Sequence, residues 1–363
     1  MYSLSKRQLN TLLLILSIVG ILVVIIYGIT LHKKGDAPLN KAGFTGFNDA
    51  WIIQTDEGGM TMSLPAVADV KAGEAVSISH QTPSNLNDDT VLYFRTEYQA
   101  VEVKLDNQII YSYGVDEVRP LGKSTVPAYH MVSLGKVCSD KNLTITYLSM
   151  YNKYAGELPV ISYGAAGDVL YSIWQDNIWI FILSILLIIV SIIVIMVYIF
   201  MGKLRHENSA LGLLVVFLWT AAIWSISDNK IMQLYINSLY VLYLLKSMVT
   251  LIIPVVYLMY VRCFIDKKKI IKYVDFGIGI YGANFVTALV LQVLGLVDLF
   301  RYMVFTEILI FIGLVIITIV LGIAVITFGK RSLRDIVVAN IIFIIFILLD
   351  FIIGIVEPDS SIH

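Results

Sequence analysis

Seven stretches of this chain are apolar for long enough to cross a bilayer as α-helices. A hydrocarbon core of about 30 Å requires roughly 20 helical residues, because unpaired backbone groups cannot face lipid. The stretches that meet this requirement lie at 9–31, 173–201, 209–227, 238–264, 275–297, 301–328 and 335–356. The pattern therefore predicts one N-terminal transmembrane anchor at 9–31 and, much later in the chain, a six-helix transmembrane bundle over 173–356.

Residues 32–170 lie between the anchor and the bundle and contain short alternating runs typical of β-strands. In AVEVKLDNQIIYSYG, Val101, Val103 and Leu105 face one way while Glu102 and Lys104 face the other. The following Asp-Asn-Gln sequence has the turn chemistry of a hairpin. About eight such runs, without a convincing helix, predict an all-β sandwich of jelly-roll type. The fold class expected is an α+β membrane protein, with this sandwich inserted between the anchor and the bundle.

Composition agrees with a membrane protein and excludes several other classes. The chain is 58% hydrophobic and 15% charged, against roughly 45–50% and 25% in soluble domains. A net charge of −1, with cations in short clusters, argues against nucleic-acid binding. The two cysteines, Cys138 and Cys263, lie in different predicted regions, and the histidines lack metal-ligand spacing. We therefore expect no disulfide, no cofactor and no metal site, and the chain contains no recognisable catalytic motif.

The distribution of cations in the short connections predicts the orientation in the plasma membrane, because cytoplasmic loops are enriched in lysine and arginine. One set of connections contains Lys6, Arg7, Lys203, Arg205, Arg262, Lys267, Lys268, Lys269, Lys272, Lys330, Arg331 and Arg334. The short connections of the opposite set contain only Lys230 and Arg301. This asymmetry places residues 1–8 in the cytoplasm, and residues 32–170 and 357–363 outside it. The stretch 9–31 is longer than the apolar part of a signal peptide, which favours an uncleaved anchor.

Tyrosines in the predicted sandwich are candidates for ligand binding. Tyr93, Tyr98, Tyr111 and Tyr113 offer flat, polar-tipped rings on which a carbohydrate or another small molecule could stack. The alternative is that these rings fill the sandwich or its edges, because β-strands favour aromatic residues.

Three charged residues lie inside predicted spans and away from the span ends, and such a residue costs about 2.5–3.5 kcal/mol at the bilayer centre. They are Lys246, Glu307 and Asp350, each about 9–12 Å from the outer end of its helix at 1.5 Å per residue. Their common depth predicts a polar junction beneath the sandwich, with Lys246 paired to Asp350 or to Glu307. The alternatives are a purely structural pair, or side chains that extend to the interface.

Two stretches resemble a known family. The sequence at 92–114, LYFRTEYQAVEVKLDNQIIYSYG, is similar to the strand-rich core of the outer domain in bacterial seven-transmembrane receptors with diverse intracellular signalling modules. The sequence at 221–234, AAIWSISDNKIMQL, resembles the end of their second bundle helix and the loop after it, and Pro254 falls where their third helix often has a proline. The similarity covers most of residues 50–356.

This resemblance implies a sensor whose outer domain precedes seven helices and a cytoplasmic output, often a GGDEF diguanylate cyclase or a histidine kinase that acts as a homodimer. The chain has six predicted spans after the outer domain and no GGDEF or kinase motif. It is therefore expected to be the input half of a truncated receptor, without the family's last helix and output. A multi-pass transporter, or its accessory subunit, is the alternative, and an intramembrane enzyme is less favoured because no catalytic constellation occurs.

Overall fold

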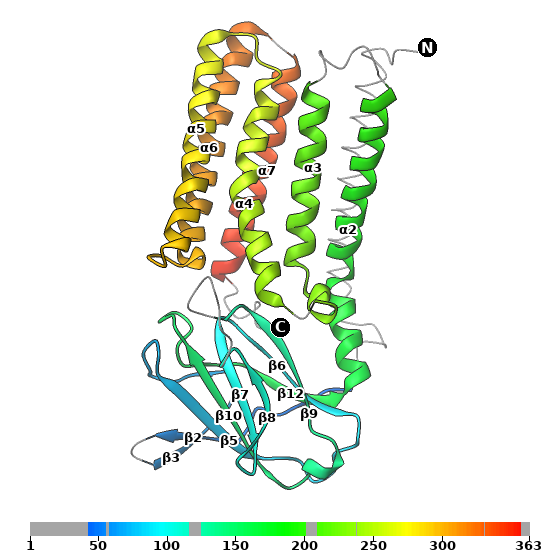
Figure 1. The fold of residues 1–363 in the computed structure, drawn as a ribbon, viewed down its shortest axis with the longest axis vertical. Helices are drawn as coiled ribbons and strands as arrows, with labels where there is room; N and C mark the ends of the chain where they lie inside the picture. The colour runs from blue at the N-terminus through cyan, green and yellow to red at the C-terminus, as the bar shows by residue number, and fades with distance from the viewer. Residues whose placement is uncertain are drawn as a thin grey trace.

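The computed structural model describes residues 43–55, 58–115, 125–200, 209–236, 238–329 and 331–356. The predicted anchor at 9–31 and both chain ends, 1–8 and 357–363, lie outside the described residues. Figure 1 shows a β-sheet domain at one end of an elongated bundle of helices. The α+β class is confirmed for the described residues, in which strands over 45–165 are followed by helices.

The β domain contains two antiparallel sheets and one short two-stranded pair. The first sheet has the order β1 (Thr45–Gly46), β12 (Ile161–Ala165), β6 (Thr90–Thr96) and β9 (Ala128–Ser133). The second has the order β3 (Gly58–Met62), β2 (Trp51–Thr55), β5 (Ala75–Gln81), β10 (Asn142–Ser149), β7 (Gln99–Leu105) and β8 (Gln108–Tyr113). The short pair joins β4 (Ala66–Val67) to β11 (Glu157–Leu158). Eight of these strands, β1-β12-β6-β9 facing β5-β10-β7-β8, have the order of a jelly roll.

The sandwich core follows from the alternation in the sequence. On β7, Val101, Val103 and Leu105 are buried, whereas Glu102 and Lys104 are partly exposed. These residues pack in one cluster with Leu92 and Phe94 of β6, together with Val132 and Ile161 of the same sheet. Each large side chain buried in this way contributes roughly 1.5–3 kcal/mol. Shared burial between the two sheets therefore holds the sandwich together.

The predicted hairpin after β7 is present. Asp106 and Asn107 form the two-residue turn to β8, with φ angles of 46° and 68°. Two positive φ values in succession are those of the tight hairpin turn whose twist matches the flanking strands, and asparagine and aspartate tolerate them. This turn places β8 at the edge of its sheet.

The helices are α2 (Ala166–Phe200), α3 (Ser209–Asp228), the short helix η3 (Lys230–Leu234), α4 (Leu239–Arg262), α5 (Lys268–Val293), α6 (Leu299–Phe328) and α7 (Arg331–Val356). Over the described residues, α2 to α6 are the five helices long and apolar enough to cross a membrane, which indicates a multi-pass membrane protein. The helix α7 packs beside α6. The helix α5 begins at Lys268 rather than at 275, because the lysine-rich connection continues as helix.

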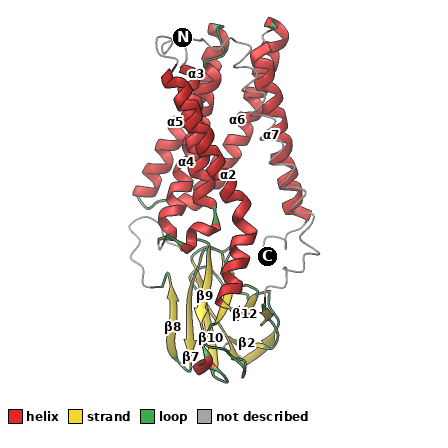
Figure 2. Cartoon of the chain, turned by 90° about the vertical axis from the view of Figure 1, so that its right-hand side faces the viewer, coloured by secondary structure: helices red, strands yellow, loops and turns green. Residues whose placement is uncertain are grey.

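The helix α2 joins the two parts of the molecule directly, as Figure 2 shows. It follows β12 without a loop and has 35 residues, which span about 52 Å at 1.5 Å each. That length exceeds a hydrocarbon core of about 30 Å, so its first turns extend beyond the span. In those turns Val169 and Ile173 are buried against Val91 on the outer face of β6. The helix therefore begins seven residues before the predicted span at 173–201, and the added turns contact the β domain.

Candidate ligand-binding site

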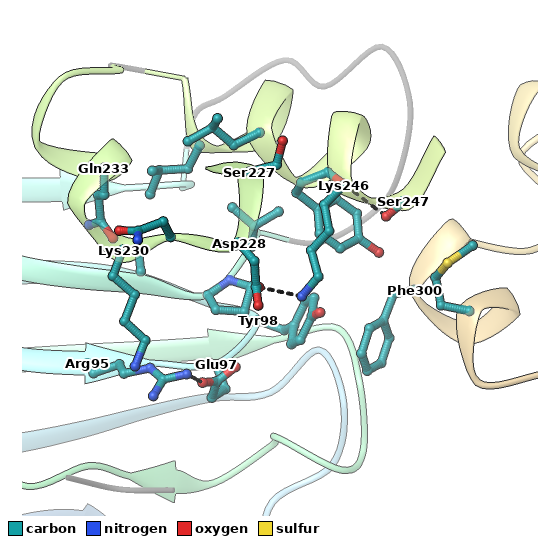
Figure 3. Close-up of a pocket in the computed structure, with 18 of the residues that line it drawn as sticks. Arg95, Glu97, Tyr98, Ser227, Asp228, Lys230, Gln233, Lys246, Ser247 and Phe300 are labelled. Carbon is teal, nitrogen blue, oxygen red and sulfur yellow. Dashed lines mark hydrogen bonds and ion pairs between the residues drawn. The ribbon is translucent and has the colours of Figure 1, made fainter. Parts of the chain in front are cut away.

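A cavity of about 470 Å³ lies where the β domain meets the ends of the helices (Figure 3). Its β-domain wall includes Arg95, Glu97, Tyr98, Tyr129, Lys153 and Tyr154. Its helical wall includes Asp228, Lys230, Leu242, Lys246, Phe300 and Glu307. The two walls come from α3, η3, α4 and α6 on one side and from the turn after β6, the start of β9 and the loop after β10 on the other.

The turn between β6 and β7 points into this cavity. Glu97 and Tyr98 form the turn, and Tyr98 has a φ of 53°. This left-handed conformation costs a residue with a side chain roughly 1–2 kcal/mol. The hydroxyl of Ser149 donates to the Tyr98 carbonyl at 2.9 Å, which fixes the turn. Its aromatic contacts offset the strain: the Tyr98 ring lies 4.1 Å from that of Phe300.

Phe300, in the first turn of α6, packs against a cluster of tyrosines from the β domain. The ring centroids of Tyr151 and Tyr154 lie 4.9 and 5.8 Å from that of Phe300. The Tyr151 hydroxyl also donates to Asp298 Oδ2 at 2.8 Å, at the start of the same helix. Burial, together with this bond to a carboxylate, raises the pKa of Tyr151 above its usual range. The phenol therefore stays a donor, and the loop after β10 is attached to α6.

A second connection joins the β domain to η3. The side-chain amide of Gln233 accepts from the Tyr129 backbone N–H at 3.1 Å and donates to the Tyr129 carbonyl at 2.6 Å. Because β9 is an edge strand, these backbone groups have no neighbouring strand to pair with. The glutamine amide takes the place of a further strand at this position, so η3 is held at the sheet edge.

Charged side chains gather at the β-domain end of the cavity. Arg95 forms an ion pair with Glu97. The cationic groups of Arg95 and Lys230 lie 5.5 and 5.2 Å from the centroid of the Tyr129 ring, within the range of cation–π attraction. Burial raises the pKa of Glu97, although the charges of Arg95, Lys230 and Lys153 oppose that rise. Three cations therefore surround one carboxylate, and we call Arg95, Lys153 and Lys230 the cation cluster.

At the helical end, the predicted polar junction has an unexpected member. The amine of Lys246 lies 2.5 Å from Asp228 Oδ1, and both side chains are partly exposed. The partner of Lys246 in this structure is thus Asp228, at the end of α3, rather than Glu307 or Asp350. Glu307 lines the same cavity, as the predicted junction requires. Asp350 lies in α7, but its side chain is outside the described part of the structure.

The four candidate tyrosines have separate environments. Tyr98 lines the cavity. The Tyr93 ring stacks on that of Tyr129 at 5.7 Å, on the outer sheet face that receives the helices. Tyr111 and Tyr113 pack on the sandwich core, where their hydroxyls contact His130 at 2.9 Å and the Val126 carbonyl at 3.0 Å. The structure therefore does not bring the four rings together as one stacking surface.

Several cavity residues are not among the site residues that the sequence predicts. Phe300 begins a long apolar helix, and nothing in the pattern distinguishes it from its neighbours. Asp228, Lys230 and Gln233 do have a signal, because they form a polar interruption, SDNKIMQ, between two apolar runs. That interruption marks where η3 contacts the β domain. Among the residues that the structure describes, no group of three or more histidine, cysteine or acidic side chains is placed to hold a metal ion.

Comparisons with family models, curated proteins and solved structures found no match to this chain.

Proposed function

We propose that this chain is the input module of a membrane receptor, and that its small-molecule ligand binds in the cavity between the β domain and the helices. The observation that carries the proposal is the shared lining of that cavity. A molecule in contact with both Tyr98 and Lys246 would interact with the β domain and the bundle together. Its binding energy then depends on how the two parts are positioned, which is the requirement for a ligand to shift a conformational equilibrium.

The contacts around the cavity support a mechanical link. Tyr151 is hydrogen-bonded to the start of α6, Gln233 holds η3 on β9, and α2 continues directly from β12. A shift of the turn at Glu97–Tyr98 would therefore act on helices that continue through the bundle. A ligand that binds one arrangement about 100-fold more tightly than the other shifts their balance by about 2.7 kcal/mol.

In this proposal the β domain lies outside the cytoplasm and the helices carry the change to a cytoplasmic output. The family resemblance described above suggests a diguanylate cyclase or a histidine kinase, acting as a pair. A carbohydrate is one ligand class that the tyrosine-lined wall accommodates, because sugars stack on aromatic faces. The volume of about 470 Å³ suits a small molecule rather than a macromolecule.

Hydrogen exchange on the purified chain in nanodiscs tests the proposal. Candidate ligands would be a panel of neutral and acidic sugars and amino acids, each compared with buffer alone. We expect one ligand to slow exchange both in the turn at 95–98 and in the helical segment at 228–246. Tyr98→Asn, which removes the ring but tolerates a positive φ, should abolish both effects. Slower exchange confined to the β domain, or no slowing of exchange by any ligand of the panel, would contradict the proposal.

Transport is the second candidate, and one observation favours it. Asp228, Lys246 and Glu307 line the cavity from helices that qualify as membrane spans, and ionisable residues in such positions often mark a substrate path. Uptake of a panel solute by proteoliposomes containing the chain would support transport. A ligand that changes hydrogen exchange without being taken up would support the receptor instead.

A further inference from the structure

We infer that the ligand of this cavity carries an anionic group, a carboxylate or a phosphate, which binds at the cation cluster of Arg95, Lys153 and Lys230. The inference rests on the proposed function, because it takes the cavity to be the ligand site. It goes further in naming the chemistry that the ligand must present and the residues that receive it.

The first argument is the balance of charge. The cavity is lined by four cationic side chains: Arg95, Lys153, Lys230 and Lys246. Of its three lining carboxylates, Glu97 pairs with Arg95 and Asp228 pairs with Lys246, while Glu307 belongs to α6. Among the described residues, neither Lys153 nor Lys230 has a carboxylate within ion-pair distance. Arg95, Lys153 and Lys230 face Glu97, and Glu157 also interacts with Lys153 and Glu97, so three cations against two carboxylates leave an excess of one positive charge at this end of the cavity.

The second argument is that these cations are held in place. The amine of Lys230 lies 5.2 Å from the centroid of the Tyr129 ring, and that of Lys153 lies 5.0 Å from the Tyr154 ring. Figure 3 shows the Lys230 side chain extending from η3 toward the β domain, where the Arg95 guanidinium lies near the same Tyr129 ring. Side chains already packed on rings lose little freedom when they bind, so an anion gains most of its electrostatic energy.

The third argument concerns where this charge lies. Lys230 belongs to η3, whereas Arg95 and Lys153 belong to the β domain. Like charges brought together from two parts of the protein repel each other, and an anion between them removes that repulsion. An anionic ligand therefore favours the arrangement in which η3 and the β domain are close. This gives the ligand a direct means of acting on the contact between the two parts.

The test measures thermal unfolding of the full chain in nanodiscs at constant ionic strength. The probes are glucose, glucuronate and glucose 6-phosphate, which share one ring but differ in charge, together with acetate and inorganic phosphate as simple anions. We expect stabilisation by at least one acidic probe and none by glucose. Lys153→Gln and Lys230→Gln should each weaken the apparent affinity about tenfold or more, since each removes a charged partner.

Lys136→Gln is the matched control. It removes the same charge from an exposed lysine in η1 (Lys136–Cys138), which does not line the cavity, so the affinity should not change. Equal binding of an acidic probe by all three variants would mean that the anion binds elsewhere, and would overturn the inference. Stabilisation by glucose as strong as by the acids, lost in Tyr98→Asn, would overturn it while leaving the cavity as the ligand site. If no probe stabilises the chain, carboxylates and phosphates of this size are rejected.

Discussion

The stability of the β domain should fall as the pH falls from 7 to 5, and His130 should be a principal cause. Its side chain is fully buried on β9, between Phe94, Tyr111 and Tyr113. The ring nitrogens contact the Thr96 hydroxyl at 2.7 Å and the Tyr111 hydroxyl at 2.9 Å. Burial without an acidic partner lowers the pKa of His130 to about 3. The folded protein therefore keeps this imidazole neutral.

The sign and the magnitude follow from proton linkage. An unfolded histidine has a pKa of about 6.5, so below that pH the unfolded chain binds a proton that the folded chain excludes. Because the folded pKa is lowered, the stability from His130 is fully present above pH 6.5 and is lost as the pH falls toward 3. Between pH 7 and pH 5 the loss amounts to about 2 kcal/mol.

The perturbation that isolates this effect is His130→Gln. Glutamine can donate and accept hydrogen bonds to Thr96 and Tyr111 but does not titrate. Opening free energies of amides in β9 and β10, measured by hydrogen exchange on the full chain at pH 7 and pH 5, give the stability of the core strands. The wild type should lose about 2 kcal/mol more than the variant over this range. Equal losses in the two proteins would refute the reasoning, because other titrating groups are common to both.

Three further substitutions test the packing that surrounds the site. Gln233→Glu keeps an acceptor for the Tyr129 N–H but sets a carboxylate against its carbonyl, and should loosen η3 by about 1–3 kcal/mol, seen as faster exchange at 230–236. Phe300→Ala should cost about 2 kcal/mol in thermal unfolding, less than a fully buried phenylalanine because this ring is half-buried; an unchanged transition would show that the tyrosine cluster contributes little. Gly313→Ala places a methyl in collision with the Tyr281 hydroxyl and should destabilise the bundle by about 1–3 kcal/mol. Adding Tyr281→Phe should restore part of that loss, and strict additivity of the two changes would contradict the predicted clash.

Local patterns in the sequence predict much of the fold. Alternation over Val101, Val103 and Leu105 identifies a strand and its buried face, because side chains of a strand alternate between two faces. The polar pair Asp106-Asn107 identifies the hairpin, since both residues tolerate positive φ. Helix lengths are less accurate, as in α2, whose first turns pack on the β domain. The apolar run predicts the span but does not indicate that the helix begins seven residues earlier, at Ala166.

The candidate site is harder to predict, because its parts are distant in the sequence. Tyr98 and Phe300 contact each other across the junction, yet neither pattern nor spacing indicates their proximity. Lys246 and Glu307 are predicted to lie together because they have similar depths in the membrane, and both line the cavity. Depth does not identify Asp228 as the partner of Lys246, because Asp228 lies one residue beyond the predicted span at 209–227. Pairing across helices depends on rotation about each helix axis, which an almost uniformly apolar sequence does not specify.

If the chain is a receptor, as proposed above, the arrangement of contacts makes the junction the place where a signal would arise. Three of the contacts between the β domain and the helices, among the residues that the structure describes, are at separated elements: α2 continues from β12, η3 is held by Gln233, and α6 is held by Tyr151 and Phe300. A rigid domain fixed at three places cannot tilt without moving at least one helix relative to the others. The cavity lies between the second and third of these contacts, so the proposed ligand would change their separation directly. A ligand bound at the far edge of the sandwich, beyond β2 and β3, could move a helix only by deforming the close-packed core. That deformation would cost much more free energy.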